Sequence, residues 1–462
     1  MHMMSQAPHE FNNQFLKKNE LASLLGKDLN EQKLANEIGS YFDRLFPIMR
    51  SITGEGVRES LAIISEIQPL DINEIPTGTK VFDWIVPKEW IFKEAYLIGP
   101  DGKRVLDVAD HTLHLLNYSI PFRGIVSRAE LDKHLYSLPD QPDAIPYVTS
   151  YYTERWGFCL SEKHRRSLPD GDYSVVIDTE LSDGTLSIGE CILHGESDSE
   201  VLISTNICHP SLANNELSGV LVSAFLARQV ATWPQRRLTY RFVFLPETIG
   251  SLAYLARFGE HLKSKLIAGY QIVCVGTNQP YVFKMSRRED SLSDRAAKTA
   301  LTHSFKSNFE IRRFQADWGS DERQYCSPGF NLPIGSLLRS VYDEYDEYHT
   351  SLDDRSFVSF ASMAETVQTC AFILQHLEKN QIYVNQLPHG EAQLGRRGLY
   401  PTLGNYQTNM DQVSAMLWLL NLSDGDNDLI AIAERSGCDI RLLSHFARLF
   451  CDKGLLIERD NA

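Results

Sequence analysis

Three segments of this chain place a potential metal ligand or general base after an apolar run. His209, Glu247 and His349 follow the strand-like runs 201–203, 240–245 and 332–338. Open α/β sheets bring the carboxyl ends of their strands to one edge, so we expect these three side chains to lie close together. Imidazole and carboxylate are common zinc ligands, and a carboxylate beside a bound metal can act as a general base. The arrangement therefore predicts a metal-dependent hydrolytic site.

Each of these residues also has a simpler interpretation. His209 alone could be a buried imidazole bonded to backbone, and His349 lies in the acidic run 342–354, which could be a solvated loop. Glu247 could cap a helix that begins near Ile249. The three strand ends together favour metal ligation by the two histidines, with acidic neighbours orienting His349, and a base or ligand role for Glu247.

The loop after the first run contains Asn215 and Glu216 at the start of a predicted helix. Asparagine is a poor zinc donor, so Glu216 is the predicted carboxylate ligand, although a glutamate there could simply interact with the helix dipole. The sequence leaves open which of the two faces the metal. Asp321 is predicted as a supporting group or a partner for a substrate amine, and Tyr152 is predicted to position that amine or the developing oxyanion.

Composition restricts the class of protein. The chain of 462 residues is long enough for two or three domains, and no apolar run approaches the about 20 residues that cross a bilayer. The formal net charge of −15 opposes general nucleic-acid binding, which depends on neutralising phosphates. The eight cysteines are scattered without a CxxC pair, and residues 1–30 lack the apolar segment of a secretory signal. We therefore expect a cytoplasmic protein that neither spans a membrane nor binds nucleic acid.

The character of the sequence changes along the chain and predicts several domains. These are a polar lead-in (1–30), an α/β domain (31–70 and 147–380), an inserted β-rich domain (71–146), and a linker with a winged-helix domain (381–462). Asp183-Gly184 predicts a hairpin turn between the strands 173–177 and 185–193. Residues 380–410 are expected to be irregular.

Several motifs resemble those of known metallopeptidases. Residues 209–219, 246–251 and 348–350 resemble the metal-site loops of the co-catalytic zinc aminopeptidases. The whole chain resembles a bacterial family with an aminopeptidase-like domain of unassigned function. That wider resemblance rests on the further segments 45–54, 82–90 and 151–159. It implies a zinc-aminopeptidase-like three-layer α/β core, an inserted small β-rich domain and a C-terminal winged-helix domain.

The resemblance is less complete at the metal site. The aminopeptidases bridge two metals with the aspartate of an Asp-Asn-x-Ser-Gly motif, and this chain has an asparagine at the corresponding position, Asn215. They carry paired glutamates where this chain has Glu247-Thr248, and residues 275–278, after the next strand, offer no aspartate ligand. The sequence therefore predicts one metal ion rather than two.

We expect a single zinc ion held by His209, Glu216 and His349, with Glu247 activating a metal-bound water for attack on an amide carbonyl. The substrate would be a small peptide or an amide-bearing metabolite such as an acylated amino sugar. One alternative is an amide-forming or acyl-transfer enzyme of a biosynthetic pathway. Another is a scaffold whose metal site has decayed and whose winged helix contacts a protein partner, and a homo-oligomer is compatible with all three.

Overall fold

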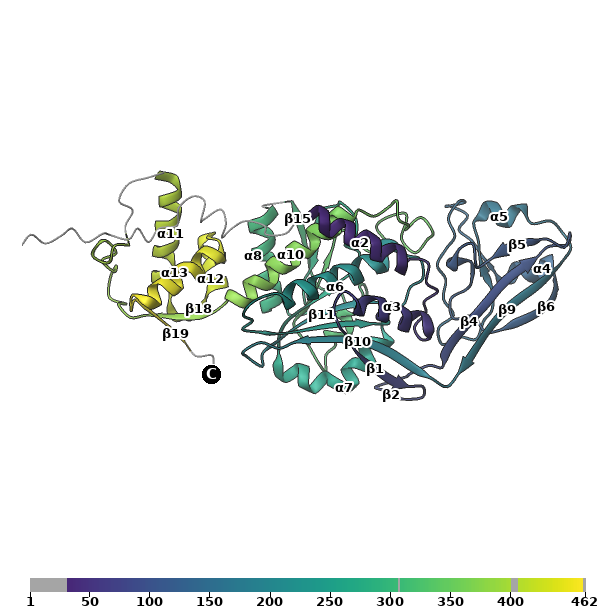
Figure 1. The fold of residues 1–462 in the computed structure, drawn as a ribbon, viewed down its shortest axis with the longest axis horizontal. Coiled ribbons are helices and arrows are strands. Elements are labelled where there is room, and N and C mark those ends of the chain that lie inside the picture. Colours follow the sequence, from purple (N-terminus) through teal and green to yellow (C-terminus); the bar gives the residue numbers. More distant parts are fainter. Residues whose placement is uncertain (1–30, 306–307, 400–405, 460–462) are drawn as a thin grey trace, which may run out of the picture. The chain divides into compact units, whose positions relative to one another are not determined.

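The computed structural model describes residues 31–305, 308–399 and 406–459, so the predicted lead-in 1–30 lies outside the described residues. The chain divides into two compact units. Of the described residues, the larger unit contains 31–298, 305 and 308–371, and the smaller contains 299–304, 372–399 and 406–459. Figure 1 shows the elements of each unit, which we describe separately.

The larger unit is built on an eight-stranded sheet. Its strands, in spatial order, are β1 (Asp71–Pro76), β10 (Thr185–Leu193), β12 (Thr239–Leu245), β11 (Glu200–Asn206), β13 (Leu266–Ile272), β16 (Ile334–Leu338), β14 (Tyr281–Lys284) and β15 (Phe309–Arg312). The four central strands β12, β11, β13 and β16 are parallel, and every residue of β11, β12 and β16 is buried. Strands buried on both faces are expected where helices cover both sides of a parallel sheet.

The helices between these strands form the outer layers. Helix α6 (Ser218–Ala231) connects β11 to β12, and α7 (Ile249–Lys265) connects β12 back across β11 to β13. Right-handed crossovers that run in opposite directions along a sheet put their helices on opposite faces. Figure 1 shows α2 (Glu31–Leu45), α3 (Glu55–Ser65) and α6 on one side of the strands and α7 on the other. Further helices are α8 (Leu292–Phe305), α9 (Glu322–Tyr325) and α10 (Phe360–Lys379). The predicted α/β class with three layers is therefore confirmed.

A second, four-stranded antiparallel sheet belongs to the same unit. Its order is β5 (Arg104–Asp107), β4 (Glu89–Ile98), β9 (Asp172–Ser182) and β6 (Phe122–Ser127). Strand β9 pairs with β4 and β6, whereas β10 pairs with β1 and β12 in the large sheet. The hairpin predicted at Asp183-Gly184 is therefore wrong, because this turn passes the chain from one sheet to the other. The boundaries 71 and 146 of the inserted domain stay predictions.

Short elements complete the larger unit. They are β2 (Lys80–Val81), β3 (Trp84–Ile85), α4 (Arg128–Leu131), β7 (Leu135–Tyr136), β8 (Phe158–Cys159) and α5 (Glu162–Ser167). The hairpin of β2 and β3 exposes several large apolar side chains, among them Trp84.

The smaller unit contains three helices and a three-stranded sheet. The helices are α11 (Tyr406–Leu422), α12 (Leu429–Ser436) and α13 (Ile440–Asp452). The antiparallel sheet has the order β18 (Asp424–Asp428), β17 (Ile382–Asn385) and β19 (Leu456–Glu458). Strand β17 corrects the expectation that 380–410 is irregular, since its four residues gain their ladder partners from strands more than 35 residues later. Among the described residues, none of the helices combines the length and the apolar character that a membrane span requires.

Candidate metal-dependent site

The candidate site lies where the parallel strands β11, β12 and β13 end. Because the chain goes from β11 to β12 and then back across β11 to β13, the loops after these strands separate and leave room at the sheet edge. The loop after β11 carries Cys208 and His209, the turn after β12 carries Glu247, and Cys274 follows β13. The later loop 342–354, which contains His349, packs against the same edge, since Asp353 bonds to the backbone of the β11 loop.

The two ring nitrogens of His209 face different carboxylates. Nδ1 lies 2.7 Å from Oε2 of Glu216, and Nε2 lies 3.7 Å from Oε2 of Glu247. Glu216 is buried, and its Oε1 accepts a hydrogen bond from the backbone N–H of Cys208. A carboxylate at one imidazole nitrogen fixes the ring orientation and leaves the other nitrogen for a metal or a proton.

The electrostatics of His209 follow from this burial. Burial alone would lower the pKa of its imidazole, but the adjacent Cys208 sulfur and the Glu216 carboxylate raise that pKa well above the ordinary histidine value. Oε2 of Glu216 has no well-directed hydrogen bond to any described residue, although the Nδ1 atom is close. A buried carboxylate oxygen in this position is suited to a cation on or beside the ring.

His349 has a different environment. Its Nε2 lies 2.9 Å from Oδ1 of Asn215, its ring stacks on Tyr348, and its centroid is 5.5 Å from that of His209. Burial, together with the charge of His209, lowers the pKa of His349 to about 3. The imidazole is therefore neutral at physiological pH, which is the form that binds a metal. Its backbone has a φ of 53°, and such strained conformations concentrate at functional sites.

Asn215, rather than Glu216, faces His349. Both residues belong to a single π-helical turn, Ala213–Leu217, that precedes α6. Such turns are rare and occur frequently at functional sites. The Asp353 carboxylate accepts hydrogen bonds from the backbone N–H groups of Asn214 and Asn215 at 2.6 and 2.8 Å. The expected role of the acidic neighbours in orienting His349 is thus taken by Asn215, and Asp353 holds the turn.

Sequence reasoning missed Cys274. This buried residue follows β13, just before the segment 275–278 in which the aminopeptidase resemblance implies an aspartate, and its sulfur accepts a hydrogen bond from Nδ2 of Asn215 at 3.3 Å. Its φ of 49° directs the chain sharply at the strand end. Its position just after an apolar strand is the sequence feature that indicates it, and cysteine was not considered there because a carboxylate ligand was expected.

Glu247 is held by a chain of polar side chains from the sheet. The hydroxyl of Ser320 donates to its Oε1 at 2.8 Å, Asn206 donates to Ser320 at 3.0 Å, and Gln271 donates to Asn206 at 3.0 Å. All three supporting residues are buried, whereas the Glu247 side chain is 34% exposed. The carboxylate is therefore fixed on one side and open to a substrate on the other. The following residue, Thr248, has a φ of 63°.

Asp321 lies beneath the Glu247 turn. Its Oδ1 accepts the backbone N–H of Thr248 at 2.7 Å, and its Oδ2 has no hydrogen-bond partner among the described residues. Complete burial, and next the charge of Glu247, raises the pKa of Asp321 well above the ordinary aspartate value. A fully buried carboxyl group that lies under the Glu247 turn suits a supporting role better than contact with a substrate amine.

The aromatic residues near the site divide into two groups. Tyr147 packs against both histidines, with centroid distances of 4.9 Å to His209 and 5.3 Å to His349, and its hydroxyl bonds to that of Tyr151 at 2.8 Å. Tyr152 is 50% exposed, and its ring packs edge-on against Trp84 at 5.2 Å. The structure therefore places Tyr147 at the histidines and Tyr152 in an exposed aromatic pair.

The two histidines are spaced as ligands of one metal ion are. Two imidazoles bound to one tetrahedral zinc have ring centres about 5 Å apart, close to the 5.5 Å between His209 and His349. A second donor set lies behind the ring. Among the described residues, only Cys208, His209 and Glu216 form a group of three metal-capable side chains whose donor atoms all lie within 4.8 Å of one another. His209 belongs to both sets, and only the first is next to the open side of Glu247.

Comparison with known proteins relates this site to a fold. The chain is 41% identical over 418 residues to a Clostridium acetobutylicum protein named "Putative polysaccharide biosynthesis protein with aminopeptidase-like domain", covering 90% of this chain and 95% of that protein. A crystal structure described as a "putative peptidase" from the same organism matches with a TM-score of 0.87 and 40% identity, over 93% of this chain and 98% of that one.

More distant structures share the fold alone. The zinc aminopeptidase BSAP from Bacillus subtilis matches with a TM-score of 0.57 and 12% identity, over 76% of this chain and 96% of that one. The core of this protein thus has the zinc-aminopeptidase fold, as predicted. The model for a winged helix-turn-helix matches residues 381–458, which confirms the predicted C-terminal module. The model described as "Domain of unknown function (DUF4910)" matches residues 40–380, and the chain accordingly belongs to this family, with a winged helix-turn-helix at its C-terminal end.

Proposed function

We propose that this protein is a single-zinc hydrolase that cleaves an amide bond in a small peptide or an amide-bearing metabolite. The observation that carries the proposal is the pairing of His209 Nε2 with the half-open carboxylate of Glu247, 3.7 Å apart at the strand edge of a zinc-aminopeptidase fold. A metal ligand beside an oriented carboxylate is the arrangement that metal-assisted hydrolysis requires.

The proposed metal ligands are His209 and His349, and Glu216, the carboxylate ligand predicted from the sequence, is proposed to support His209 from its Nδ1 side. The position of Glu216 at Nδ1 supports an action through the ring of His209, as a hydrogen-bonded carboxylate that strengthens a histidine ligand. In the direct-ligand alternative, a metal would bind Nδ1, Glu216 and Cys208 together. Replacement of Cys208 by serine distinguishes these arrangements, because only the second uses its sulfur.

The remaining residues would move protons and hold the substrate. Zinc, when bound, supplies Lewis acidity that makes water acidic and a carbonyl electrophilic. Glu247 would take the proton of the attacking water at Oε2 and return it to the leaving nitrogen, while Ser320 keeps Oε1 oriented. Asp321 would support the Glu247 turn. Tyr152 stays a predicted contact for the free amine or the developing oxyanion, with its ring beside Trp84.

The substrate is proposed from the relative named for polysaccharide biosynthesis. An amide on an amino sugar combines that context with the hydrolytic site. The same context favours a second candidate, the formation or transfer of an acyl group onto an amine. We further propose a cytoplasmic location, consistent with eight free cysteines, and a protein contact for the winged helix.

The test uses the purified full chain, its metal content and a panel of N-acyl amino sugars, aminoacyl amides and aminoacyl thioesters. We expect about one zinc per chain and hydrolysis of one amide class that disappears after chelation and returns with zinc. Transfer from thioesters without amide hydrolysis would replace this proposal by the acyl-transfer candidate. If the chain binds no metal under these conditions, the histidines are not metal ligands in either the hydrolase or the acyl-transfer candidate. The scaffold interpretation would then remain.

A further inference from the structure

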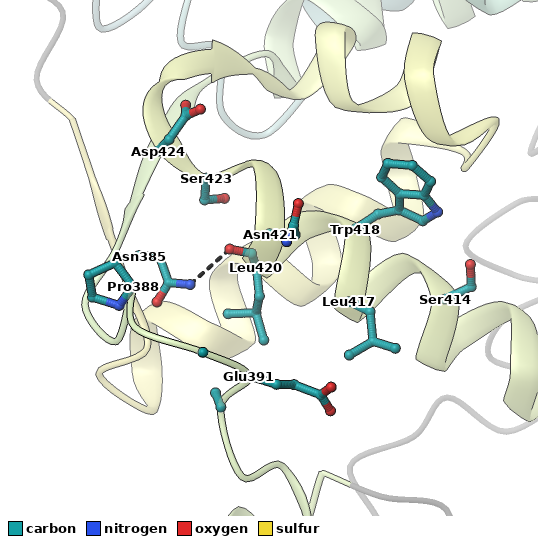
Figure 2. A pocket seen from close by; sticks show the side chains of 12 residues that line it. Asn385, Pro388, Glu391, Ser414, Leu417, Trp418, Leu420, Asn421, Ser423 and Asp424 are labelled. Carbon is teal, nitrogen blue, oxygen red and sulfur yellow. Dashed lines mark hydrogen bonds between the residues drawn. The ribbon is translucent and has the colours of Figure 1, made fainter.

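The smaller unit contains a pocket that the proposed hydrolytic site does not use. It has a volume of about 700 Å³, within the usual size of small-molecule sites. The segment after β17, the second half of α11 and the start of β18 form its walls (Figure 2). We propose that this pocket binds a small organic amine with an apolar or aromatic body.

The pocket contains a buried hydroxyl without a hydrogen-bond partner among the described residues. Ser423 is 1% exposed and lines the pocket, and its Oγ has no hydrogen-bond partner among the described residues. A buried polar group without a partner is costly, so such groups commonly await a ligand or water. Neighbouring polar side chains are already bonded. Asn385 donates to the carbonyl of Leu420 at 2.8 Å (Figure 2), and the Asp424 carboxylate accepts from the turn that follows it.

The charged side chains that line the pocket are negative. Glu391 is exposed at the pocket, and no hydrogen bond or ion pair links its carboxylate to another described residue. The lining residues include two carboxylates, Glu391 and Asp424, and no lysine, arginine or histidine. Carboxylates in a wall that has no cationic side chain attract a cation and repel an anion.

Part of the pocket wall is apolar. Leu417 projects from α11 beside Glu391 in the view of Figure 2, whereas Trp418 projects from α11 on the side away from Glu391. Pro388 and Ala392 add apolar surface. An indole face binds apolar rings, here the body of the ligand rather than its amine. A ligand with a primary amine for Glu391, a donor or acceptor for Ser423 and a flat body for Trp418 satisfies the three features together.

The experiment measures binding of three matched probes to the full chain by calorimetry: phenethylamine, phenethyl alcohol and phenylacetate. We expect saturable binding of the amine, weaker binding of the alcohol and none of phenylacetate. Glu391→Gln should lower the affinity for phenethylamine by about fivefold and leave the affinity for phenethyl alcohol unchanged, since an exposed ion pair contributes up to about 1 kcal/mol. Trp418→Ala should lower the affinities for phenethylamine and phenethyl alcohol by about tenfold or more.

Glu458→Gln is the matched control, because it removes an exposed carboxylate of β19 that does not line the pocket. It should leave the affinity for phenethylamine unchanged. Thermal melting of each variant separates loss of binding from loss of folding. Equal affinity for all three probes, no saturable binding of the amine, or unchanged binding in Glu391→Gln and Trp418→Ala would overturn the proposal.

Discussion

The candidate metal site and the C-terminal amine pocket differ in how their polar groups are paired. In the metal site His209 faces Glu216, His349 faces Asn215, and Glu247 is held by Ser320. In the amine pocket the Ser423 hydroxyl has no hydrogen-bond partner among the described residues. The side chains of the first site are held by one another, although Oε2 of Glu216 and Oδ2 of Asp321 lack hydrogen-bond partners among the described residues, whereas the second site is proposed to be completed by a ligand. Variants that disturb the paired network should therefore affect chemistry and metal binding, and variants of the amine pocket should not.

The largest expected effect comes from Glu247→Gln. Loss of the general base should reduce the turnover rate by about 10²- to 10⁴-fold while zinc content stays near that of the wild type. Steady-state kinetics on the substrate class found by the panel, with metal analysis of the same sample, measure both. Glu260→Gln, on the exposed surface of α7, is the control and should retain full activity. Full activity in Glu247→Gln would remove this residue from the chemistry.

A smaller effect is expected from Glu216→Gln. Replacing a carboxylate that orients a histidine ligand weakens metal binding by about 10- to 100-fold. Competition with a chelator measures the zinc affinity, and Cys208→Ser should leave it unchanged. If Cys208→Ser lowers the zinc affinity as much as Glu216→Gln does, the metal is bound on the Nδ1 side of His209.

The anchoring role of Asp353 predicts a pH dependence of stability. Burial raises the pKa of this carboxyl to about 7, despite the hydrogen bonds from Asn215, Asn214 and Ala213 that lower it. Because the folded state holds this proton and the unfolded state releases it near pH 4, the contribution of Asp353 to stability is greatest below pH 4 and declines as the pH rises towards 7.

Asp353→Asn should therefore flatten the change in unfolding free energy between pH 4 and 7. At pH 4 it should also cost about 1–2 kcal/mol, because one backbone N–H loses its acceptor. Urea unfolding between pH 4 and 7 measures the pH dependence of the unfolding free energy and the loss of stability at pH 4. An equally steep pH dependence in the variant would assign the effect to other carboxyl groups.

The smallest effect is expected from Ser320→Ala. Removing one hydrogen bond to a carboxylate that keeps its other contacts should lower the turnover rate by about three- to tenfold, without loss of zinc. Ser320→Thr, which retains the hydroxyl, should recover most of the rate. A Ser320→Ala enzyme with wild-type kinetics would show that the Gln271–Asn206–Ser320 chain serves folding alone.

The sequence predicted the edge of the sheet at which the site lies, because His209 and Glu247 follow buried strands whose carboxyl ends must meet. It could not predict the partners of each ring nitrogen, since those contacts depend on the π-helical turn before α6. Cys274 and Asp353 were missed as site residues because they contact Asn215 across 59 and 138 residues. The transfer of β9 to a second sheet was missed for a related reason, since a short turn is compatible with a hairpin and with a change of sheet.

The central claim is that one metal binds the open face of His209, with His349 and without sulfur. Zinc-edge X-ray absorption spectroscopy of the zinc-loaded full chain tests it most directly. The account predicts about one zinc per chain with only nitrogen and oxygen neighbours at about 2.0–2.1 Å. A sulfur neighbour at about 2.3 Å, or a chain that holds no zinc, would contradict it.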